Sequence, residues 1–307
     1  MESETVVCDF CGSAKTTSLF ELADIYHDLP GLFDLQQCDE CRLIFLSPRP
    51  TPDSMSSYYP RSYNNYRDHA IDDEPCLPIR WMRRQKLVQR RRFIERLWVD
   101  EPGRLLDVGC STGLFLNEMQ NYGWRVMGVE TSGVAADYAR QRFRLRVIDG
   151  GLTDVSLNPD SFDLVTFWDV LEHTFSPREQ LDRAASLVRD GGAVVISVPN
   201  WDSLDRWVFG KFWQGLDPPR HLFTFTETTL GAYLAETGFR VERISYFMPG
   251  YFSFVMSIER WLKSLDPHMS RIVTRVLEVP GMRFPFLPWF VLLRFLRLSP
   301  ILTVYAT

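Results

Sequence analysis

The sequence predicts an α/β protein built around an open, mostly parallel sheet. Between residues 103 and 246, short apolar segments alternate with segments of amphipathic helical spacing, a pattern typical of strands buried beneath helices. The first apolar segment, 104–108, ends in a turn with Gly109 and Gly113, after which helical spacing begins. A strand, a tight glycine turn and a helix form a nucleotide-binding start, because glycine lets the backbone approach a ligand and the helix offers free N–H groups.

Seven strands are expected in this Rossmann-like sheet. Strands are predicted over 104–108, 124–129, 145–148, 162–167, 193–198, 239–247 and 301–305, and helices over 113–122, 132–143, 177–189 and 226–237. Gly191 and Gly192 are expected to end the third of these helices. The last strand should pair beside the sixth. Ligands of such sheets lie beyond the carboxyl ends of the strands, so the residues that follow each strand are the candidates for a site.

The composition is that of a globular protein. A chain of 307 residues has room for one or two domains, and its net charge of -5 gives no support for binding nucleic acid. The first residues lack the basic start and apolar core of a signal peptide. No window holds the roughly 18 uninterrupted apolar residues of a membrane span. We therefore expect a cytoplasmic protein in a reducing compartment.

Two pairs of cysteines lie near the N-terminus, Cys8 with Cys11 and Cys38 with Cys41, and 26 residues separate the pairs. Two Cys-x-x-Cys pairs suit a tetrahedral Zn²⁺ site, since paired cysteines in a reducing compartment favour a metal over disulfides. The alternative is two coincidental pairs of reduced thiols. Four thiolates leave no open position, so the metal would be structural. Residues 1–50 are predicted to form a small zinc-binding module whose folding energy the metal supplies.

Residues 51–98 are predicted to form a linker and a basic helix. The linker is rich in Pro, Ser, Tyr and Asp, and the helix, 80–98, carries a cluster of arginines around Lys86. The helix presents either a solvated basic face or a contact for phosphate groups of a substrate or of an anionic membrane.

Residues 250–300 interrupt the alternation of strands and helices as an apolar, helical insertion. An amphipathic helix is predicted over 251–265, and the segment 284–298 is strongly apolar and aromatic, with interspersed arginines. Three interpretations of 284–298 stay open. It lies in a membrane interface with its arginines at the phosphates, it packs as a lid, or it covers the partner in a homodimer.

Two carboxylates follow the second and third predicted strands. Glu130 lies 21 residues after Gly109, where a carboxylate can accept the hydroxyls of an adenosine ribose in NAD or in S-adenosylmethionine (SAM). It could instead cap the helix that begins at Ser132. Asp149 is either a neighbour of the adenine amine or an ordinary turn residue. The turn reads Asp-x-Gly-x-Ser-x-Gly, and this glycine register disfavours a dinucleotide.

Together these motifs resemble class I SAM-dependent methyltransferases. The resemblance rests on the turn 107–113, on Glu130 and on 162–173, which ends in the Val-Leu-Glu-His of the quinone methyltransferase branch. The segment 219–230 is similar to the same broad group. The paired cysteines resemble the zinc-binding module ahead of some bacterial sugar and natural-product methyltransferases. The SAM-binding domain would then span 99–307, although the insertion is not covered by the resemblance.

The resemblance implies a role for each motif. Asp107, Gly109, Ser111 and Gly113 would hold the amino-acid end of SAM. A third glycine is commoner at Ser111, but serine is small enough to fit.

For the rest of the donor, the resemblance implies that Glu130 holds the ribose and that Asp149 and Gly150 border the adenine. Trp168 and Asp169 would flank the sulfonium, since an aromatic ring and a carboxylate both suit a cation.

Methyl transfer to oxygen or carbon also needs a base. His173 and His221 are the candidates, because histidine transfers protons near neutral pH; for each, the alternative is a role in fixing its turn or loop. Arg220 would bind a substrate carboxylate or phosphate in bidentate fashion, or form a surface salt bridge.

The leading hypothesis is SAM-dependent methylation of a sugar-, lipid- or natural-product-type small molecule, the acceptor being lipid- or phosphate-linked if the basic helix and the apolar segment bind it. One alternative is a nicotinamide-dependent oxidoreductase or epimerase, although no Tyr-x-x-x-Lys pair is present. Another is a non-catalytic SAM-fold protein whose zinc module binds a partner.

Overall fold

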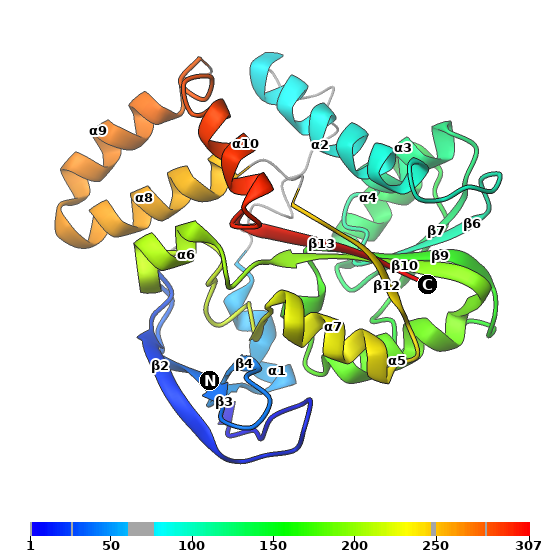
Figure 1. The fold of residues 1–307 in the computed structure, drawn as a ribbon, viewed down its shortest axis with the longest axis horizontal. Coiled ribbons are helices and arrows are strands. Elements are labelled where there is room, and N and C mark those ends of the chain that lie inside the picture. The colour runs from blue at the N-terminus through cyan, green and yellow to red at the C-terminus, as the bar shows by residue number, and fades with distance from the viewer. Residues whose placement is uncertain (1, 26, 61–76, 247–249, 280) are drawn as a thin grey trace.

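The computed structural model describes residues 2–25, 27–60, 77–246, 250–279 and 281–307, so the stretch 61–76 of the predicted linker lies outside the described residues. A seven-stranded sheet runs through the molecule (Figure 1). In spatial order its strands are β12 (Val241–Ser245), β13 (Ile301–Ala306), β10 (Val188–Pro199), β9 (Phe162–Trp168), β6 (Arg104–Val108), β7 (Arg125–Glu130) and β8 (Val147–Asp149). Only β13 runs antiparallel to its neighbours. The Rossmann-like sheet is confirmed, and so is the place of the last strand beside the sixth.

Helices cover both faces of this sheet. One face carries α2 (Leu77–Glu95), α3 (Leu114–Asn121) and α4 (Gly133–Phe143), and the other carries α5 (Pro177–Leu187) and α7 (Glu227–Glu236). Successive strand residues alternate between the two cores: Leu105 packs with the first set of helices and Leu106 with the second. Strands covered on both faces need apolar residues at every position, which is why the sequence shows continuous apolar runs.

The fifth strand begins earlier than predicted. Helix α5 ends at Leu187 and β10 starts at Val188, so Gly191 and Gly192 lie inside the strand, where its pairing with β9 is irregular. A Cβ on Gly192 would lie 2.9 Å from the carbonyl oxygens of Asp163 and Arg189. The two glycines therefore permit a close approach of backbones, and the prediction that they end a helix is wrong.

The N-terminal residues form a second, four-stranded sheet of β2 (Thr16–Leu22), β3 (Phe33–Cys38), β4 (Ile44–Leu46) and β11 (Phe223–Thr224). The short strands β1 (Ser3–Glu4) and β5 (Arg49–Pro50) pair beside it, followed by the helical turns α1 (Pro52–Met55) and η1 (Ser56–Tyr58). Strand β11 comes from much later in the sequence and begins two residues after His221. The N-terminal segment is thus joined by backbone hydrogen bonds to a predicted catalytic loop.

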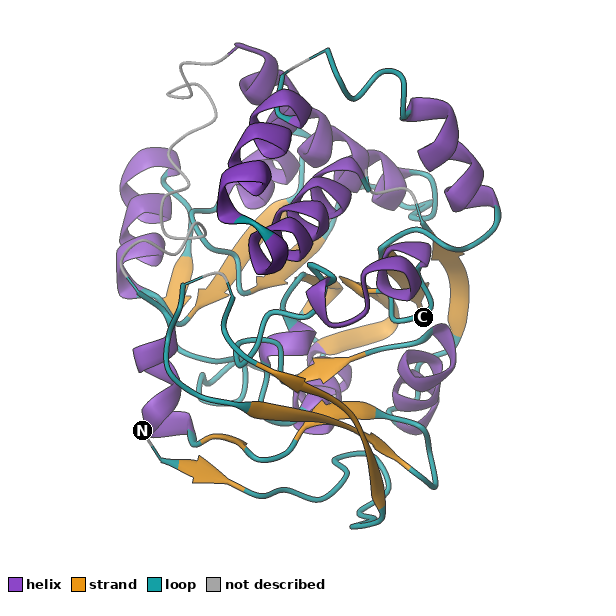
Figure 2. Ribbon diagram, turned by 90° about the vertical axis from the view of Figure 1, so that its left-hand side faces the viewer, coloured by secondary structure: helices purple, strands orange, loops and turns teal. Residues whose placement is uncertain are grey.

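The apolar insertion before the last strand is helical, as predicted. It consists of α8 (Tyr251–Leu265), α9 (Pro267–Leu277) and α10 (Leu287–Phe295), and it lies above the N-terminal strands in Figures 1 and 2. Helix α6 (Leu204–Phe209) and the turn η5 (Gly210–Phe212) contact α8. Among the described residues, no helix combines the length and the apolarity that crossing a bilayer requires.

Candidate functional site

The turn after β6 adopts the geometry that its glycines predict. Gly109 and Gly113 have φ angles of 65° and 76°, and a Cβ on Gly109 would lie 2.7 Å from Cγ2 of Val170. Ser111 has a φ angle of 48°, a left-handed conformation that costs a non-glycine residue about 1–2 kcal/mol. The departure from the commoner glycine is therefore accommodated at a modest cost.

Asp107 lies near the end of β6 and is buried. Its Oδ1 accepts a hydrogen bond from Oγ1 of Thr166 at 2.6 Å. Burial raises the pKa of Asp107 to about 7, although the Thr166 hydrogen bond and the nearby charge of Arg90 act in the opposite direction. A hydrogen-bond donor or a cation from a ligand would favour its ionised form.

Glu130 ends β7 and ties the glycine turn to the start of α4. Its Oε2 accepts the N–H of Ser111 at 2.8 Å, and its Oε1 accepts the N–H of Ser132 at 2.8 Å. The cap of α4 is Ser132 itself, whose hydroxyl accepts the N–H of Ala135, so Glu130 holds the cap residue and does not cap the helix. Oε1 also accepts the Thr131 hydroxyl at 3.5 Å. A carboxylate oxygen can accept two hydrogen bonds, so Oε2 keeps capacity for a further donor such as a hydroxyl.

Asp149 lies at the end of β8, in register with Glu130 on the neighbouring strand. Its Oδ1 accepts a hydrogen bond from Nη2 of Arg140 at 2.7 Å, and its side chain is largely exposed. The N–H of Gly150 donates to the carbonyl of Glu130 at 3.0 Å. The structure therefore brings Asp149 and Gly150 beside Glu130, as the sequence predicts for a single ligand.

Trp168 is the last residue of β9 and Asp169 follows it, and both contact a cation. The guanidinium carbon of Arg90 lies 4.6 Å from the centre of the Trp168 ring. Asp169 accepts hydrogen bonds from Nη2 of Arg90 at 2.8 Å and from Nζ of Lys86 at 3.4 Å. Burial would raise the pKa of Asp169, but Lys86 and Arg90 hold it below its ordinary value. Trp168 and Asp169 thus contact side-chain cations of α2 in this structure.

The basic helix is accordingly not a wholly solvated face. Arg90 and Arg91 are buried. Arg91 donates to Glu95 and Glu118 at 2.6 and 2.8 Å, and its guanidinium lies 3.6 Å from the centre of the Tyr122 ring. The ion pair with Glu118 and the contact with Tyr122 fix α2 against α3.

His173 and His221 lie together, with ring centres 4.5 Å apart. His173 belongs to the turn η4 (Leu171–His173) after β9. Nδ1 of His173 donates to the carbonyl of Arg220 at 2.9 Å, and Nδ1 of His221 donates to the carbonyl of Gly215 at 2.8 Å. Because a carbonyl only accepts, each ring keeps its lone pair on Nε2. Burial lowers the pKa of both imidazoles, that of His173 to about 3, so both are neutral near pH 7.

Glu172 is a member of this site that the sequence analysis did not single out. Its carboxylate, one nitrogen of His173 and one of His221 all lie within 4.8 Å of one another. Burial, and secondly the charge of Asp169, raise the pKa of Glu172 well above its ordinary value. The available signal was an acidic residue beside a histidine just past a strand.

Arg220 is neither a substrate clamp nor a surface salt bridge, so both interpretations of it are wrong. It is fully buried. Its guanidinium donates to Asp24 at 2.8 and 3.0 Å and to Asp217 at 2.8 Å. Arg260 of α8 donates to the carbonyl of Leu216 at 2.6 Å. The loop that carries His221 is thus anchored to the N-terminal segment and to the insertion.

Replacing Arg220 with methionine is expected to lower the free energy of unfolding by about 3–5 kcal/mol, because the buried carboxylates of Asp24 and Asp217 would each lose the guanidinium that pairs with them most closely. Urea denaturation followed by circular dichroism measures this change. The control is Arg240→Met, which removes an exposed pair with Glu242 and should leave stability near that of the wild type. Equal effects of the two substitutions would contradict the structural role of the buried pair.

The four N-terminal cysteines form the predicted cluster. Sγ of Cys8 lies 3.4 Å from Sγ of Cys41, Sγ of Cys11 lies 3.5 Å from Sγ of Cys38, and all four lie within 4.8 Å of one another. Four thiolates bound about 2.3 Å from one Zn²⁺ in a tetrahedron lie about 3.8 Å apart. The cluster therefore has nearly the dimensions of a Cys₄ zinc site.

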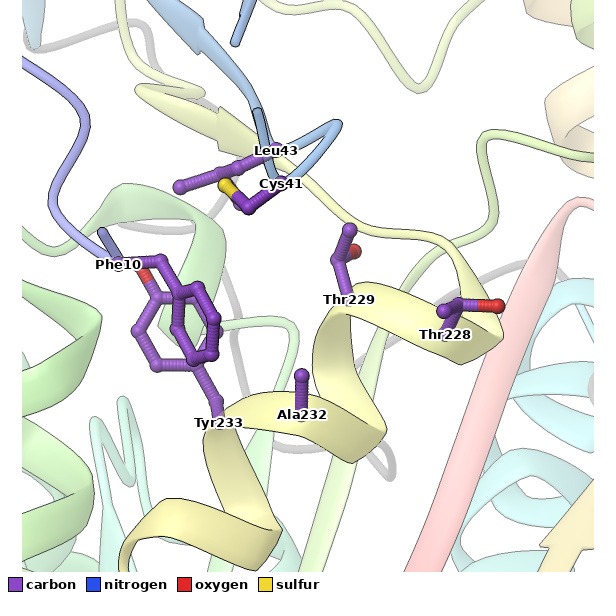
Figure 3. Close-up of a pocket in the computed structure, with 7 residues that line it drawn as sticks. All are labelled: Phe10, Cys41, Leu43, Thr228, Thr229, Ala232 and Tyr233. Carbon is purple, nitrogen blue, oxygen red and sulfur yellow. The ribbon is translucent and has the colours of Figure 1, made fainter. Parts of the chain in front are cut away.

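The first cysteine pair also docks the N-terminal segment onto the large domain. Asp9 accepts hydrogen bonds from the hydroxyls of Ser176 and Tyr233, each at 2.8 Å, and the Phe10 ring packs against Tyr233. Figure 3 shows a small pocket at this joint. It is lined by Phe10, Cys41, Leu43, Thr228, Thr229, Ala232 and Tyr233. None of the residues predicted to bind SAM lines it, so it is not the predicted donor site.

The chain is similar in sequence to a known domain family and to curated proteins. Residues 80–244 match the family model described as a methyltransferase domain. The chain is 29% identical over 151 residues to a ubiquinone biosynthesis O-methyltransferase of Alkalilimnicola ehrlichii, covering 44% of this chain and 61% of that protein. It is 35% identical over 111 residues to the protein of the same name from Aeromonas salmonicida, covering 32% and 43%. The chain thus spans about half the length of the curated relatives it matches.

Two solved structures share the fold. A SAM-dependent methyltransferase from Archaeoglobus fulgidus superposes with a TM-score of 0.50 at 21% identity, covering 73% of this chain and 93% of that one. Magnesium protoporphyrin IX methyltransferase from Synechocystis, with bound S-adenosylhomocysteine, gives 0.53 at 16% identity, covering 83% and 98%. The resemblance inferred from the sequence is confirmed: the chain belongs to the methyltransferase domain family and has the fold of SAM-dependent methyltransferases.

Proposed function

We propose that this protein transfers a methyl group from SAM to an oxygen or carbon of a small molecule. The proposal rests on the carboxyl ends of β6 and β7, which lie side by side. There, Glu130 at the end of β7 accepts a hydrogen bond from the glycine turn that follows β6. Asp107, Gly109, Ser111 and Gly113 would hold the amino-acid end of SAM. The family match makes the nicotinamide alternative the weaker one, in agreement with the glycine register.

The remainder of the donor would lie along the next strand ends. Glu130 would accept a ribose hydroxyl at Oε2, and Asp149 and Gly150 would border the adenine. The contacts of Arg90 with Trp168 and Asp169 support binding of a cation, such as the sulfonium, at this place. Arg90 would then compete with the sulfonium for the Asp169 carboxylate.

The acceptor is proposed to present a hydroxyl at the His173–His221 pair. The names of the relatives, ubiquinone biosynthesis O-methyltransferases, support transfer to oxygen. As the oxygen bonds to the methyl carbon, the carbon–sulfur bond breaks, S-adenosylhomocysteine leaves and the hydroxyl proton is lost. The two imidazoles are proposed to assist that loss.

A lipid-linked acceptor or a peripheral membrane contact would use the apolar insertion. Helix α10 exposes Trp289, Leu292 and Phe295, which supports contact with a lipid, a membrane surface or a second copy of the chain. The four cysteines are proposed to bind one structural Zn²⁺, in keeping with their spacing.

Replacing His221 with alanine is expected to lower kcat by about 10²–10⁴-fold, the range for loss of a group that assists proton transfer, while SAM affinity stays unchanged. Turnover with labelled SAM and SAM titration by calorimetry measure the two quantities. His268→Ala, on the exposed surface of α9, is the matched control. Full activity of the His221 variant would remove it from the reaction.

A further inference from the structure

Helix α8 buries polar side chains, although it belongs to the apolar insertion. Three of its five buried residues are polar, namely Ser253, Ser257 and Arg260. Their spacing of i, i+4 and i+7 places them on one face of the helix. The large apolar side chains of Phe252 and Trp261 are exposed instead. A helix that served only for packing would bury its apolar residues, so the buried polar face indicates a specific task.

The buried polar face of α8 holds the backbone of residues 213–217, the loop that precedes His221. Ser257 accepts the N–H of Gln214 on its hydroxyl at 2.9 Å. The guanidinium of Arg260 donates to four groups of the loop, which are the carbonyls of Trp213 at 3.2 Å, Gln214 at 3.4 Å and Leu216 at 2.6 Å and the carboxylate of Asp217 at 3.4 Å. The path of this loop is therefore set by α8.

The carbonyl of Gly215, in the middle of this loop, binds His221. It accepts the Nδ1–H of His221 at 2.8 Å, whereas the carbonyls on either side of it bind Arg260. Gly215 has no room for a side chain, because a Cβ there would collide with the ring of Trp213, which is fully buried. A neutral imidazole has one N–H and one lone pair, so this bond keeps the proton on Nδ1 and the lone pair on Nε2.

We propose that Arg260 is a positioning residue for methyl transfer, which fixes the Gly215 carbonyl and thereby holds the Nε2 lone pair of His221 ready for the acceptor hydroxyl. The use of Nε2 rests on the proposed function, whereas the orientation of the ring does not. A base that is itself oriented by a third group is the usual arrangement for activating a nucleophile. Through Arg260, the insertion, which lies beyond the residues 80–244 that match the family model, takes part in the reaction.

The test is nitrogen-15 NMR of the histidine side chains in the whole chain, which distinguishes the two neutral tautomers. His221→Ala assigns the signals of His221. We expect one tautomer in the wild type, with the proton on Nδ1, and a mixture of both in Arg260→Met, because the Gly215 carbonyl can then turn. Ser257→Ala removes a single hydrogen bond to the loop and should give the same change to a smaller extent, so the test does not depend on the folding of Arg260→Met.

Lys263→Met is the matched control. Lys263 is another cation of α8, but it binds Ile25 and Asp28 of the N-terminal segment. Its replacement should leave His221 in the tautomer of the wild type.

Turnover of labelled SAM, with a catechol as the probe acceptor, measures the consequence for the reaction. Arg260→Met is expected to lower kcat at least about tenfold, as part of the loss expected without His221, with SAM affinity unchanged. The double variant with His221→Ala should be no slower than His221→Ala alone, because both substitutions act on one group.

Two outcomes would overturn the inference. One is a single, unchanged tautomer of His221 in both Arg260→Met and Ser257→Ala, and the other is a double variant in which the two losses of kcat multiply. Calorimetric titration with SAM separates the two proposals. Wild-type protein that shows the single tautomer but binds no SAM would overturn the proposed function alone.

Discussion

Replacing Cys8 with serine is expected to abolish binding of the proposed zinc ion and to unfold the N-terminal strands. Structural Zn²⁺ contributes about 10–16 kcal/mol to the folding of zinc-finger peptides, far more than one side-chain contact. Cys8 is buried within the shared core. The effect should also reach the catalytic loop, because β4 pairs with β11 and Asp24 holds Arg220. Turnover should therefore fall together with the zinc content.

Elemental analysis of zinc, with circular dichroism and limited proteolysis, measures this outcome. The matched control is Cys110→Ala, which removes a buried thiol outside the cluster and should leave the zinc content unchanged. Wild-type protein that is folded and free of metal would contradict the zinc proposal.

Replacing Glu130 with alanine is expected to weaken SAM binding at least tenfold. A hydrogen bond to a charged group contributes about 1.5–3 kcal/mol, and the ribose would lose such a partner. The substitution also removes the acceptor for the N–H groups of Ser111 and Ser132, so the turn itself would loosen. Calorimetric titration with SAM measures the change.

Asp137→Ala is the control for this second prediction, because Asp137 is an exposed acidic residue of α4 that pairs with Arg140 of the same helix. Its SAM affinity should match that of the wild type. Unchanged SAM affinity in the Glu130 variant would rule out a role for Glu130 in binding the ribose.

The parts of the fold that the sequence predicted are those encoded locally. The strand over 104–108 and the glycine turn after it were predicted correctly, because apolar runs and left-handed glycines carry their own signal. The two residues of β11 carry none, since they become a strand only by pairing with β4. The same holds for Gly191 and Gly192, whose place inside β10 follows from neighbours on another strand.

The candidate site, like the fold, was predictable where local sequence patterns encode it. The sequence identified the strand ends that lie together, and it identified both histidines. It could not show that Arg220 would be buried, because its partner Asp24 is 196 residues away. Nor could it single out Glu172, whose environment is completed by His221, far along the chain. Such groups acquire their roles from tertiary contacts that no local pattern encodes.

The central claim, that the strand ends of β6 and β7 form a SAM site, is tested most directly by titrating the wild-type protein with SAM and, separately, with NAD. The account predicts saturable binding of one SAM per chain and no binding of NAD. Absence of SAM binding by folded protein, or binding of NAD that Glu130→Ala abolishes, would contradict it.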